Sequence, residues 1–226
     1  MRVVIAGGHG QIALRLERLL AARGDEVVAL VRNPDHVADV DATGASAALV
    51  DLERDSAETL STHLAGADAV VFAAGAGPGS GAARKDTVDR GAAALLADAA
   101  KLVGIRRYLL VSSMGAGAEP PRSAPADEDS VFAAYLQAKR AAEQDLRARD
   151  LDWTILRPGG LTNEPGIGRV RLEPAVPRGR VTRDDVAAVL AGLLAEPRSA
   201  GLTLELIEGD VPVDAAVAGA LTPLDG

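Results

Sequence analysis

The stretch Arg2 to Ala13, Arg-Val-Val-Ile-Ala-Gly-Gly-His-Gly-Gln-Ile-Ala, decides the fold of this chain. Its first five residues form a mostly apolar run that is typical of a buried strand and leads directly into a glycine turn. Gly8, Gly10 and Ala13 match the pattern G-x-G-x-x-G/A, in which glycine permits a tight turn and a close approach of the backbone to a pyrophosphate. Gly7, Gly10 and Ala13 also match G-x-x-G-x-x-A, so the register stays open. Both frames predict a dinucleotide-binding turn.

The residues after the turn supply the helix and the second strand that such a turn requires. An apolar stripe with helical spacing begins at Ile12 and continues through Leu16 to Leu20. Gly24 is a helix C-cap signal, and Glu26 to Val31 then reads as a strand. This βαβ unit predicts that the pyrophosphate is bound by the turn residues Gly7, Gly8, His9, Gly10, Gln11 and Ile12. A catalytic role is not expected for His9, which has no partner in the sequence.

Arg32 occupies the position just past the second strand that distinguishes the two nicotinamide dinucleotides. An Asp or Glu there would bond the ribose 2′-hydroxyl of NAD, whereas a guanidinium pairs with the 2′-phosphate of NADP. NADP is therefore the predicted cofactor, and NAD remains possible. The alternative interpretation of Arg32 is a solvated surface arginine.

Composition excludes several classes of protein. The net charge of −8 and the absence of a basic run at either end argue against a nucleic-acid partner. The chain contains no cysteine, which excludes disulfides, thiolate metal sites and a thiol nucleophile. No apolar run approaches the roughly 18 residues of a membrane span, and the first strand leaves no room for a signal peptide. We expect a cytoplasmic protein with a small-molecule substrate and no membrane partner; the oligomeric state is not predicted.

The rest of the chain alternates short apolar runs with longer alanine-rich stretches of helical period. The runs predict strands at 47–50, 69–73, 108–111, 153–156 and 202–207, and the longer stretches predict helices at 57–64, 82–103, 131–149 and 183–194. Apolar rather than alternating strands indicate a parallel sheet covered on both faces. We therefore predict one α/β domain over residues 1–226, built on a doubly wound parallel sheet.

Two stretches interrupt this alternation. Residues 115–129 and 158–179 are rich in proline and glycine, and we expect both to be irregular loops. Each follows a strand, and ligands of open α/β sheets bind at the carboxyl ends of strands. The two loops are predicted to form a wall around the substrate; surface loops without a role are the alternative.

A candidate catalytic group follows the predicted strand at 108–111. Tyr135 and Lys139 lie four residues apart on one predicted helical face, downstream of Ser112 and Ser113. A lysine ammonium stabilises a nearby phenolate, so Tyr135 can act as a general acid or base at a carbonyl or alcohol. Ser113, or Ser112, would hold the substrate oxygen. The alternative is that Tyr135 is core packing and that Lys139 reaches solvent.

These residues belong to a set of motifs that resembles a known family. The set comprises Gly7 to Gly10, Asp51-Leu52, Ala73 to Gly77, Ser112 to Ala116, Tyr135 with Lys139, Leu151 to Gly159, and Val181 to Ala187. Over about residues 1–207, the chain resembles the atypical short-chain dehydrogenase/reductases of the NAD(P)H-binding, NmrA-like kind, which have a Rossmann fold.

The resemblance implies a location for each remaining cofactor residue. Asp51 and Leu52 would lie at the adenine, and Ala73, Ala74 and Gly75 along the adenosine ribose and phosphate. On the nicotinamide side, the resemblance implies Ser112 or Ser113, the pair Pro158-Gly159, and Lys139 as a ligand of the ribose.

The implied activity is NAD(P)H-dependent reduction of a small carbonyl, a quinone or a similar acceptor. A non-catalytic protein that senses NADP(H) is the alternative from another class. An epimerase that retains NAD is less expected, because the chain lacks the larger C-terminal substrate domain of the sugar-nucleotide enzymes.

Overall fold

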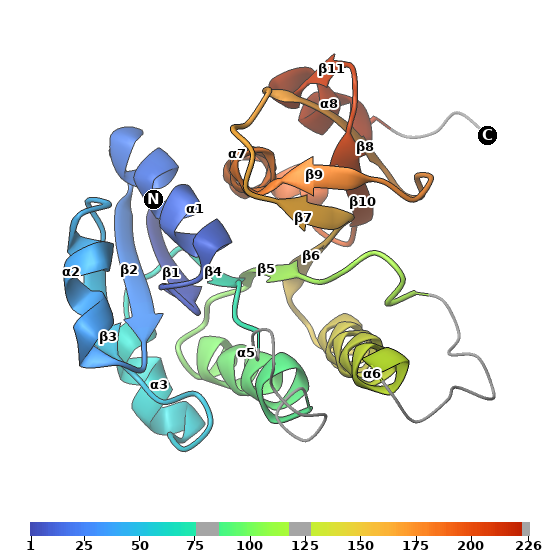
Figure 1. Cartoon of the computed structure of the whole chain (residues 1–226). Helices are drawn as coiled ribbons and strands as arrows, with labels where there is room; N and C mark the ends of the chain where they lie inside the picture. The colour runs from blue at the N-terminus through green and yellow to red at the C-terminus, as the bar shows by residue number, and fades with distance from the viewer. Residues whose placement is uncertain (76–85, 118–127, 223–226) are drawn as a thin grey trace.

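The structure is a computed structural model and describes residues 1–75, 86–117 and 128–222 (Figure 1). Its centre is a sheet with the strand order β11-β8-β10-β6-β5-β4-β1-β2-β3. The strands of this sheet are β1 (Arg2–Ala6), β2 (Glu26–Val31), β3 (Ser46–Leu49), β4 (Ala69–Phe72), β5 (Arg107–Val111), β6 (Asp152–Pro158), β8 (Arg169–Glu173), β10 (Thr203–Glu208) and β11 (Val211–Pro212). A separate parallel pair consists of β7 (Gly160–Thr162) and β9 (Arg180–Thr182).

The part of the sheet from β3 to β10 is parallel throughout. Strands β1 to β3 extend the sheet in one direction, and β4 to β6 extend it in the other, starting again next to β1. This reversal is the topological switch point of a doubly wound sheet, where ligands bind at the carboxyl ends of the strands. The predicted fold class is confirmed. At the far edge, β8 is antiparallel to both β10 and β11.

Helices cover both faces of the sheet, and successive strand residues pack against opposite layers. In β1, Val3 and Ile5 belong to the core under α1, α7 and α8, whereas Val4 and Ala6 belong to the core over α3, α5 and α6. The helical segments are α1 (Gln11–Ala22), η1 (Pro34–His36), α2 (Val37–Asp41), α3 (Ala57–Leu64), the π-helix η2 (Asp86–Ala92), α5 (Ala93–Leu102), α6 (Glu128–Arg147), α7 (Arg183–Ala195), η3 (Pro197–Ser199) and α8 (Val213–Ala220). Burial of both sheet faces explains the unbroken apolar runs of the parallel strands.

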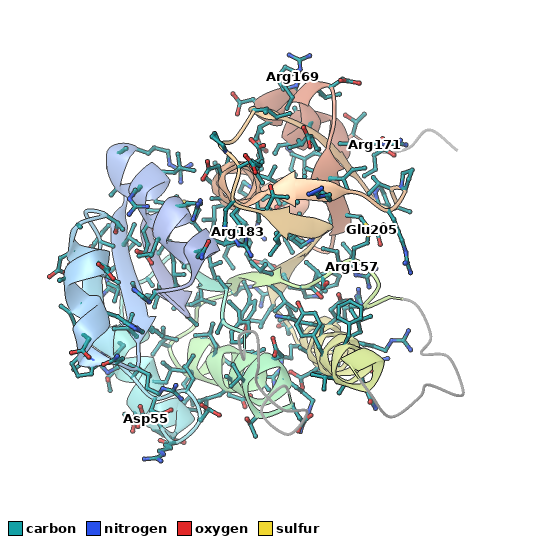
Figure 2. The ribbon with its side chains drawn as sticks, in the orientation of Figure 1. Asp55, Arg157, Arg169, Arg171, Arg183 and Glu205 are labelled. Atoms are coloured by element: carbon teal, nitrogen blue, oxygen red, sulfur yellow. The ribbon has the colours of Figure 1, made fainter. Side chains whose placement is uncertain are left out.

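The stretch 158–179 was expected to be irregular, and this expectation is wrong for part of it. It contains β7 and β8. In β8 the side chains alternate: Val170 and Leu172 are buried, while Arg169 and Arg171 lie exposed on the outside of the molecule (Figure 2). A strand near the end of the sheet with one solvated face needs only this short alternation, and the neighbouring prolines fall in the connecting turns.

Two other expected segments are only partly described. Of the loop 115–129, residues 118–127 lie outside the described residues, and α6 begins at Glu128. Of the helix 82–103, residues 82–85 lie outside them, and the described part is a π-helix continued by α5. None of the helices in the described ranges combines the length and apolarity needed to cross a bilayer.

A buried acid in α1 makes stability dependent on pH. Glu17 has no exposed surface, and burial raises its pKa from 4.5 to about 7. Thr43 Oγ1 lies 2.6 Å from the Val40 carbonyl and 3.1 Å from Glu17 Oε2. Thr43 has one hydroxyl hydrogen, which it donates to the Val40 carbonyl in the shorter bond. The Thr43 oxygen can therefore accept a hydrogen bond from a protonated Glu17. Ionisation of Glu17 therefore costs more in the folded chain than in the unfolded chain.

We expect Glu17→Gln to stabilise the protein at alkaline pH. Because the folded pKa is raised, the wild type loses stability as the pH rises from about 4.5 through 7, and glutamine lacks this titration. The variant should gain about 3 kcal/mol at pH 8 and little at pH 4. Urea unfolding at both pH values measures the difference. An equal gain at both would show that packing rather than ionisation is responsible.

Candidate functional site

The parallel strands bring the predicted site residues to one edge of the sheet. Their carboxyl ends are followed by the glycine turn after β1, Arg32 after β2, Asp51 after β3, Ala73 after β4 and Ser112 after β5, while Pro158 ends β6. Residues that are far apart in the sequence therefore share this edge, which is where a doubly wound sheet binds its ligand.

The glycine turn has features that fit a phosphate. A Cβ atom on Gly7, whose φ is +82°, would lie 2.5 Å from Ala74 Cα, and one on Gly8 would lie 2.5 Å from Ala29 Cβ. A side chain at either position would clash with these neighbouring residues, so close packing requires glycine at both. This explains why the sequence matches both frames of the motif. Gly10 is the N-cap of α1, which has no side-chain cap and no acidic residue in its first turn. The first N–H groups of α1 have no partner within the helix and suit a pyrophosphate.

His9 lies over this turn in a small cluster. Its ring stacks on His36 with 3.5 Å between the ring centroids and an interplanar angle of 11°. Its Nε2 atom is 2.7 Å from Asp39 Oδ2. These contacts hold His9 against the segment that follows β2, outside the main cavity described below.

Arg32 meets an acidic side chain from the neighbouring strand end. Its Nη1 donates to Glu53 Oε2 at 2.7 Å, and Thr87 Oγ1 donates to the other oxygen of Glu53 at 3.1 Å. Asp51 accepts from the Glu53 backbone N–H at 3.0 Å, so one of its carboxylate oxygens stabilises its own turn. A cofactor phosphate at Arg32 would thus have to share the guanidinium with Glu53.

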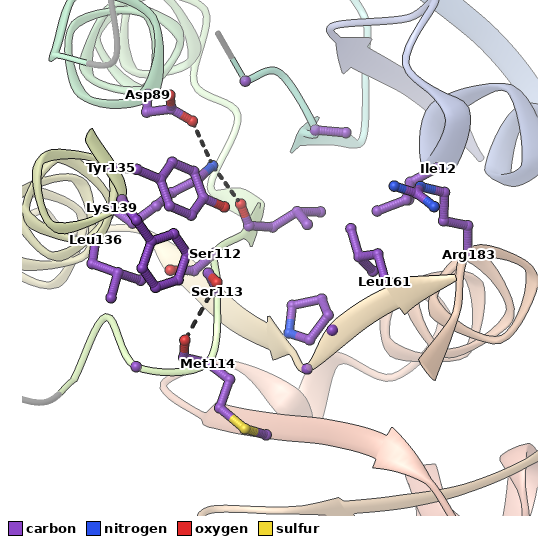
Figure 3. Close-up of a pocket in the computed structure, with 18 of the residues that line it drawn as sticks. Ile12, Asp89, Ser112, Ser113, Met114, Tyr135, Leu136, Lys139, Leu161 and Arg183 are labelled. Atoms are coloured by element: carbon purple, nitrogen blue, oxygen red, sulfur yellow. Dashed lines mark hydrogen bonds and ion pairs between the residues drawn. The ribbon is translucent and has the colours of Figure 1, made fainter. Parts of the chain in front are cut away.

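A main cavity of about 680 Å³ lies beside the ends of β4, β5 and β6, between α6 and the β7-β9 pair (Figure 3). The predicted site residues among its lining are Ile12, Ala73, Ala74, Gly75, Ser112, Ser113, Tyr135, Lys139, Pro158 and Gly159. The predicted residues outside its lining are Gly7, Gly8, His9, Gly10, Gln11, Arg32, Asp51 and Leu52. The structure therefore brings the proposed catalytic residues together, with the glycine turn and Arg32 outside the cavity on the same sheet edge.

Lys139 is buried at the back of the main cavity. Its ammonium donates to the Val111 carbonyl at 3.0 Å and forms an ion pair of 3.1 Å with Asp89, which has no exposed surface. The ammonium lies 5.8 Å from the centre of the Tyr135 ring. The alternative interpretation, in which Lys139 reaches solvent, is wrong, since only 3% of Lys139 is exposed. Asp89 belongs to the π-helix η2, a type of helix that is frequent at functional sites, and no sequence pattern marked it.

The two serines after β5 have different surroundings. Ser112 is buried, and its hydroxyl donates to Glu143 Oε1 at 2.6 Å. Ser113 is half-buried, and within the part of the chain that the structure describes its hydroxyl makes a single long contact, of 3.4 Å with the Met114 carbonyl. The structure thus leaves the Ser113 hydroxyl available to a ligand and engages that of Ser112 in the protein.

Glu143 anchors a buried network behind Ser112. Arg157 donates to both of its carboxylate oxygens, at 2.9 Å and 2.6 Å, and Arg147 donates at 2.9 Å. Burial alone would raise the pKa of Glu143, but the bonds from Arg157 and Ser112 and the nearby positive charges lower it below its ordinary value. Arg157 also lies 3.8 Å from Glu205 of β10 (Figure 2). Glu143 was not predicted, and it connects α6, β5 and β6 under the cavity.

Comparisons with known proteins agree with this arrangement. The family model described as NAD(P)H-binding matches residues 7–197. The "Uncharacterized sugar epimerase YhfK" of Bacillus subtilis is 36% identical over 218 residues, which cover 96% of this chain and 99% of that protein. A solved "Putative NAD-dependent epimerase/dehydratase" from Bacillus halodurans is 37% identical, with a TM-score of 0.87 and coverage of 97% and 99%. The "oxidoreductase ylbE" from Lactococcus lactis is 26% identical, with a TM-score of 0.83 and coverage of 98% and 97%.

The matched region contains the glycine turn, the strand ends and the cavity residues, and the similar proteins match almost the whole chain. The family resemblance expected from the motifs is confirmed at the level of NAD(P)-binding Rossmann-fold oxidoreductases and epimerases. This chain belongs to the NAD(P)H-binding family.

Proposed function

We propose that this protein is an NADPH-dependent reductase of a small carbonyl, a quinone or a similar acceptor. The observation that carries the proposal is the meeting of Ser113, Tyr135 and Lys139 in one cavity, next to Ala73 to Gly75 at the end of β4. A hydroxyl, a phenol and an ammonium at the nicotinamide end of a dinucleotide site are the groups that carbonyl reduction requires.

Each residue then has a defined task. The cofactor, when bound, supplies a hydride. Tyr135 donates its phenolic proton to the acceptor oxygen, and Ser113 donates a hydrogen bond that holds the same oxygen. Lys139 and Asp89 fix α6 against the end of β5, because the Lys139 ammonium bonds the Val111 carbonyl. Contact of Lys139 with the nicotinamide ribose would add to this anchoring.

The cofactor would lie along the sheet edge. Its pyrophosphate is proposed to bind the turn residues Gly7 to Ile12, its adenine to contact Asp51 and Leu52, and its nicotinamide to lie near Pro158 and Gly159. The described parts of the stretches 115–129 and 158–179 contribute Gly115, residues 158–161, Arg178 and Gly179 to the cavity wall. The cytoplasm remains the proposed compartment.

The test is a screen of NADPH oxidation over aldehydes, ketones and quinones, preceded by titrations with NADPH and NADH. Reduction of an acceptor by the wild type supports the proposal. Tight NADPH binding without reduction of any acceptor contradicts it and favours the sensor. Reversible interconversion of a sugar nucleotide without net NADPH consumption favours the epimerase.

Arg32 is expected to set the cofactor preference. NADPH should bind roughly tenfold tighter than NADH, since a guanidinium–phosphate contact is charge-assisted, and Arg32→Asp should abolish this preference. Glu53→Gln should increase it, because Glu53 is the present partner of Arg32. Isothermal titration with both cofactors measures these changes. Equal affinities in the wild type would show that Arg32 is only a surface residue paired with Glu53.

A further inference from the structure

The main cavity carries positive charge that its own residues do not neutralise. Its charged lining residues are Asp89, Lys139, Arg178 and Arg183. Asp89 and Lys139 pair with each other. Within the described ranges, neither Arg178 nor Arg183 forms an ion pair with a carboxylate. Two such arginines in one cavity are unexpected in a chain with a net charge of −8.

Arg183 is held in place by neutral and like-charged neighbours. It is the first residue of α7, and its Nη1 donates to the Asn163 side-chain oxygen at 2.8 Å. Burial, together with the positive charge of Arg15, lowers the pKa of Arg183. The adjacent Asp184 pairs with Arg15 and accepts from the Gly166 N–H, so it is engaged elsewhere. The guanidinium of Arg183 therefore faces the cavity with its positive charge uncompensated (Figure 3).

Arg178 lines the same cavity, is exposed, and belongs to a segment that packs closely against the end of β6. The Gly160 N–H donates to the Gly179 carbonyl at 2.9 Å, and a Cβ atom on Gly159 would lie 2.4 Å from that carbonyl oxygen. Gly159 and Gly160 thus let the backbone of Gly179, next to Arg178, pack directly against the end of β6.

The opposite wall is apolar: Met114, Phe132 and Leu136 line it, around Ser113 and Tyr135. On the side of Arg183, Leu161 adds a further apolar side chain (Figure 3). A ligand that fits both walls has an apolar body and an anionic head. Arg183 also lies beside Ile12, the one residue of the glycine turn among the lining residues, so the test must distinguish a substrate carboxylate from the cofactor phosphates (Figure 3).

We propose that Arg183, assisted by Arg178, binds a carboxylate of the acceptor, so that the preferred substrates are apolar carbonyl or quinone compounds that carry a carboxylate group. This inference rests on the proposed reductase function for the identity of the ligand as a substrate. The anion site itself can be tested without turnover.

The test compares 2-naphthoate with 2-naphthamide, which differ in charge but hardly in shape. The NADP⁺-saturated protein is titrated with each by calorimetry. The carboxylate should bind at least about tenfold tighter than the amide, as expected for a charge-assisted pair. Arg183→Gln should remove most of this difference and leave the affinities for the amide and for NADPH unchanged. Arg183→Lys, which retains a charge, should keep part of it.

The matched control is Arg198→Gln, an exposed arginine outside the cavity that pairs with Glu196, and it should change neither affinity. Equal binding of the two probes by the wild type overturns the proposal. So does a loss of NADPH affinity in Arg183→Gln with the carboxylate preference intact, which would assign the guanidinium to the cofactor. Selective naphthoate binding by a protein that reduces no acceptor would keep the anion site and reject the reductase.

Discussion

Replacing Tyr135 by phenylalanine is expected to lower the turnover number at least about a hundredfold, the usual contribution of a positioned general acid. The affinity for NADPH should barely change, because the substitution removes only the phenolic oxygen. Tyr135 is half-buried, lines the main cavity, and packs against Phe132 with 6.0 Å between ring centroids, so the ring contacts survive in the variant. Steady-state kinetics on an acceptor from the screen, with cofactor titrations, measure both quantities.

The other tyrosine of the chain provides a matched control. Tyr108 is buried in β5 outside the cavity, and its hydroxyl donates to the Ala93 carbonyl at 2.9 Å. Tyr108→Phe should cost about 1 kcal/mol of stability and leave turnover unchanged. Full activity of Tyr135→Phe would mean that the acceptor takes its proton from water, as a quinone can, and that Tyr135 is a packing residue.

Replacing Lys139 by methionine is expected to destabilise the fold by about 3 kcal/mol as well as to impair catalysis. The substitution removes the counter-ion of Asp89 in a site where neither side chain is more than 4% exposed. Removing one partner of a buried ion pair leaves a charge that the interior solvates poorly. Chemical unfolding measures the loss of stability, and cofactor titration measures the loss of NADPH affinity.

The double variant Lys139→Met/Asp89→Asn separates the two effects. It removes both charges, so it should recover most of the stability lost in Lys139→Met while turnover stays low. If Lys139→Met were as stable as the wild type and had lost only NADPH affinity, the ion pair between Lys139 and Asp89 would contribute little to the stability of the fold. Lys139 would then act mainly as the ribose ligand that the family resemblance implies.

Local patterns in the sequence determined the architecture of this protein. The glycine turn of residues 7–10, the apolar runs of the strands and the helical stripe from Ile12 all depend on spacing within a few residues. Such features are encoded locally, so the βαβ unit and the doubly wound sheet could be predicted. The spacing of Tyr135 and Lys139 likewise put both on one helical face, since a helix repeats every 3.6 residues.

The short strand β8, second from the end of the sheet, could not be predicted in this way. Its alternation of Arg169, Val170, Arg171 and Leu172 spans too few residues to be distinguished from a polar loop. It is a strand because β10 lies beside it and supplies the hydrogen-bonding partner. Helix α8 also depends on tertiary contacts. Its sequence is short and alanine-rich, and packing of Val213 and Val217 into the core with α7 stabilises it.

Only the tertiary structure decided which side chains face the cavity. Ser112 and Ser113 are indistinguishable in the sequence, and the Ser112 hydroxyl is engaged by Glu143, 31 residues away. The sequence marks Arg32 as a phosphate ligand, but it gives no sign of the Glu53 carboxylate that lies 2.7 Å from the guanidinium in the structure. Partners such as these are brought together by the packing of strands and helices that are distant in the chain. The sequence by itself determined the fold and the helix that carries the tyrosine, while the ion pairs and hydrogen bonds that tune the site depend on contacts that no local pattern encodes.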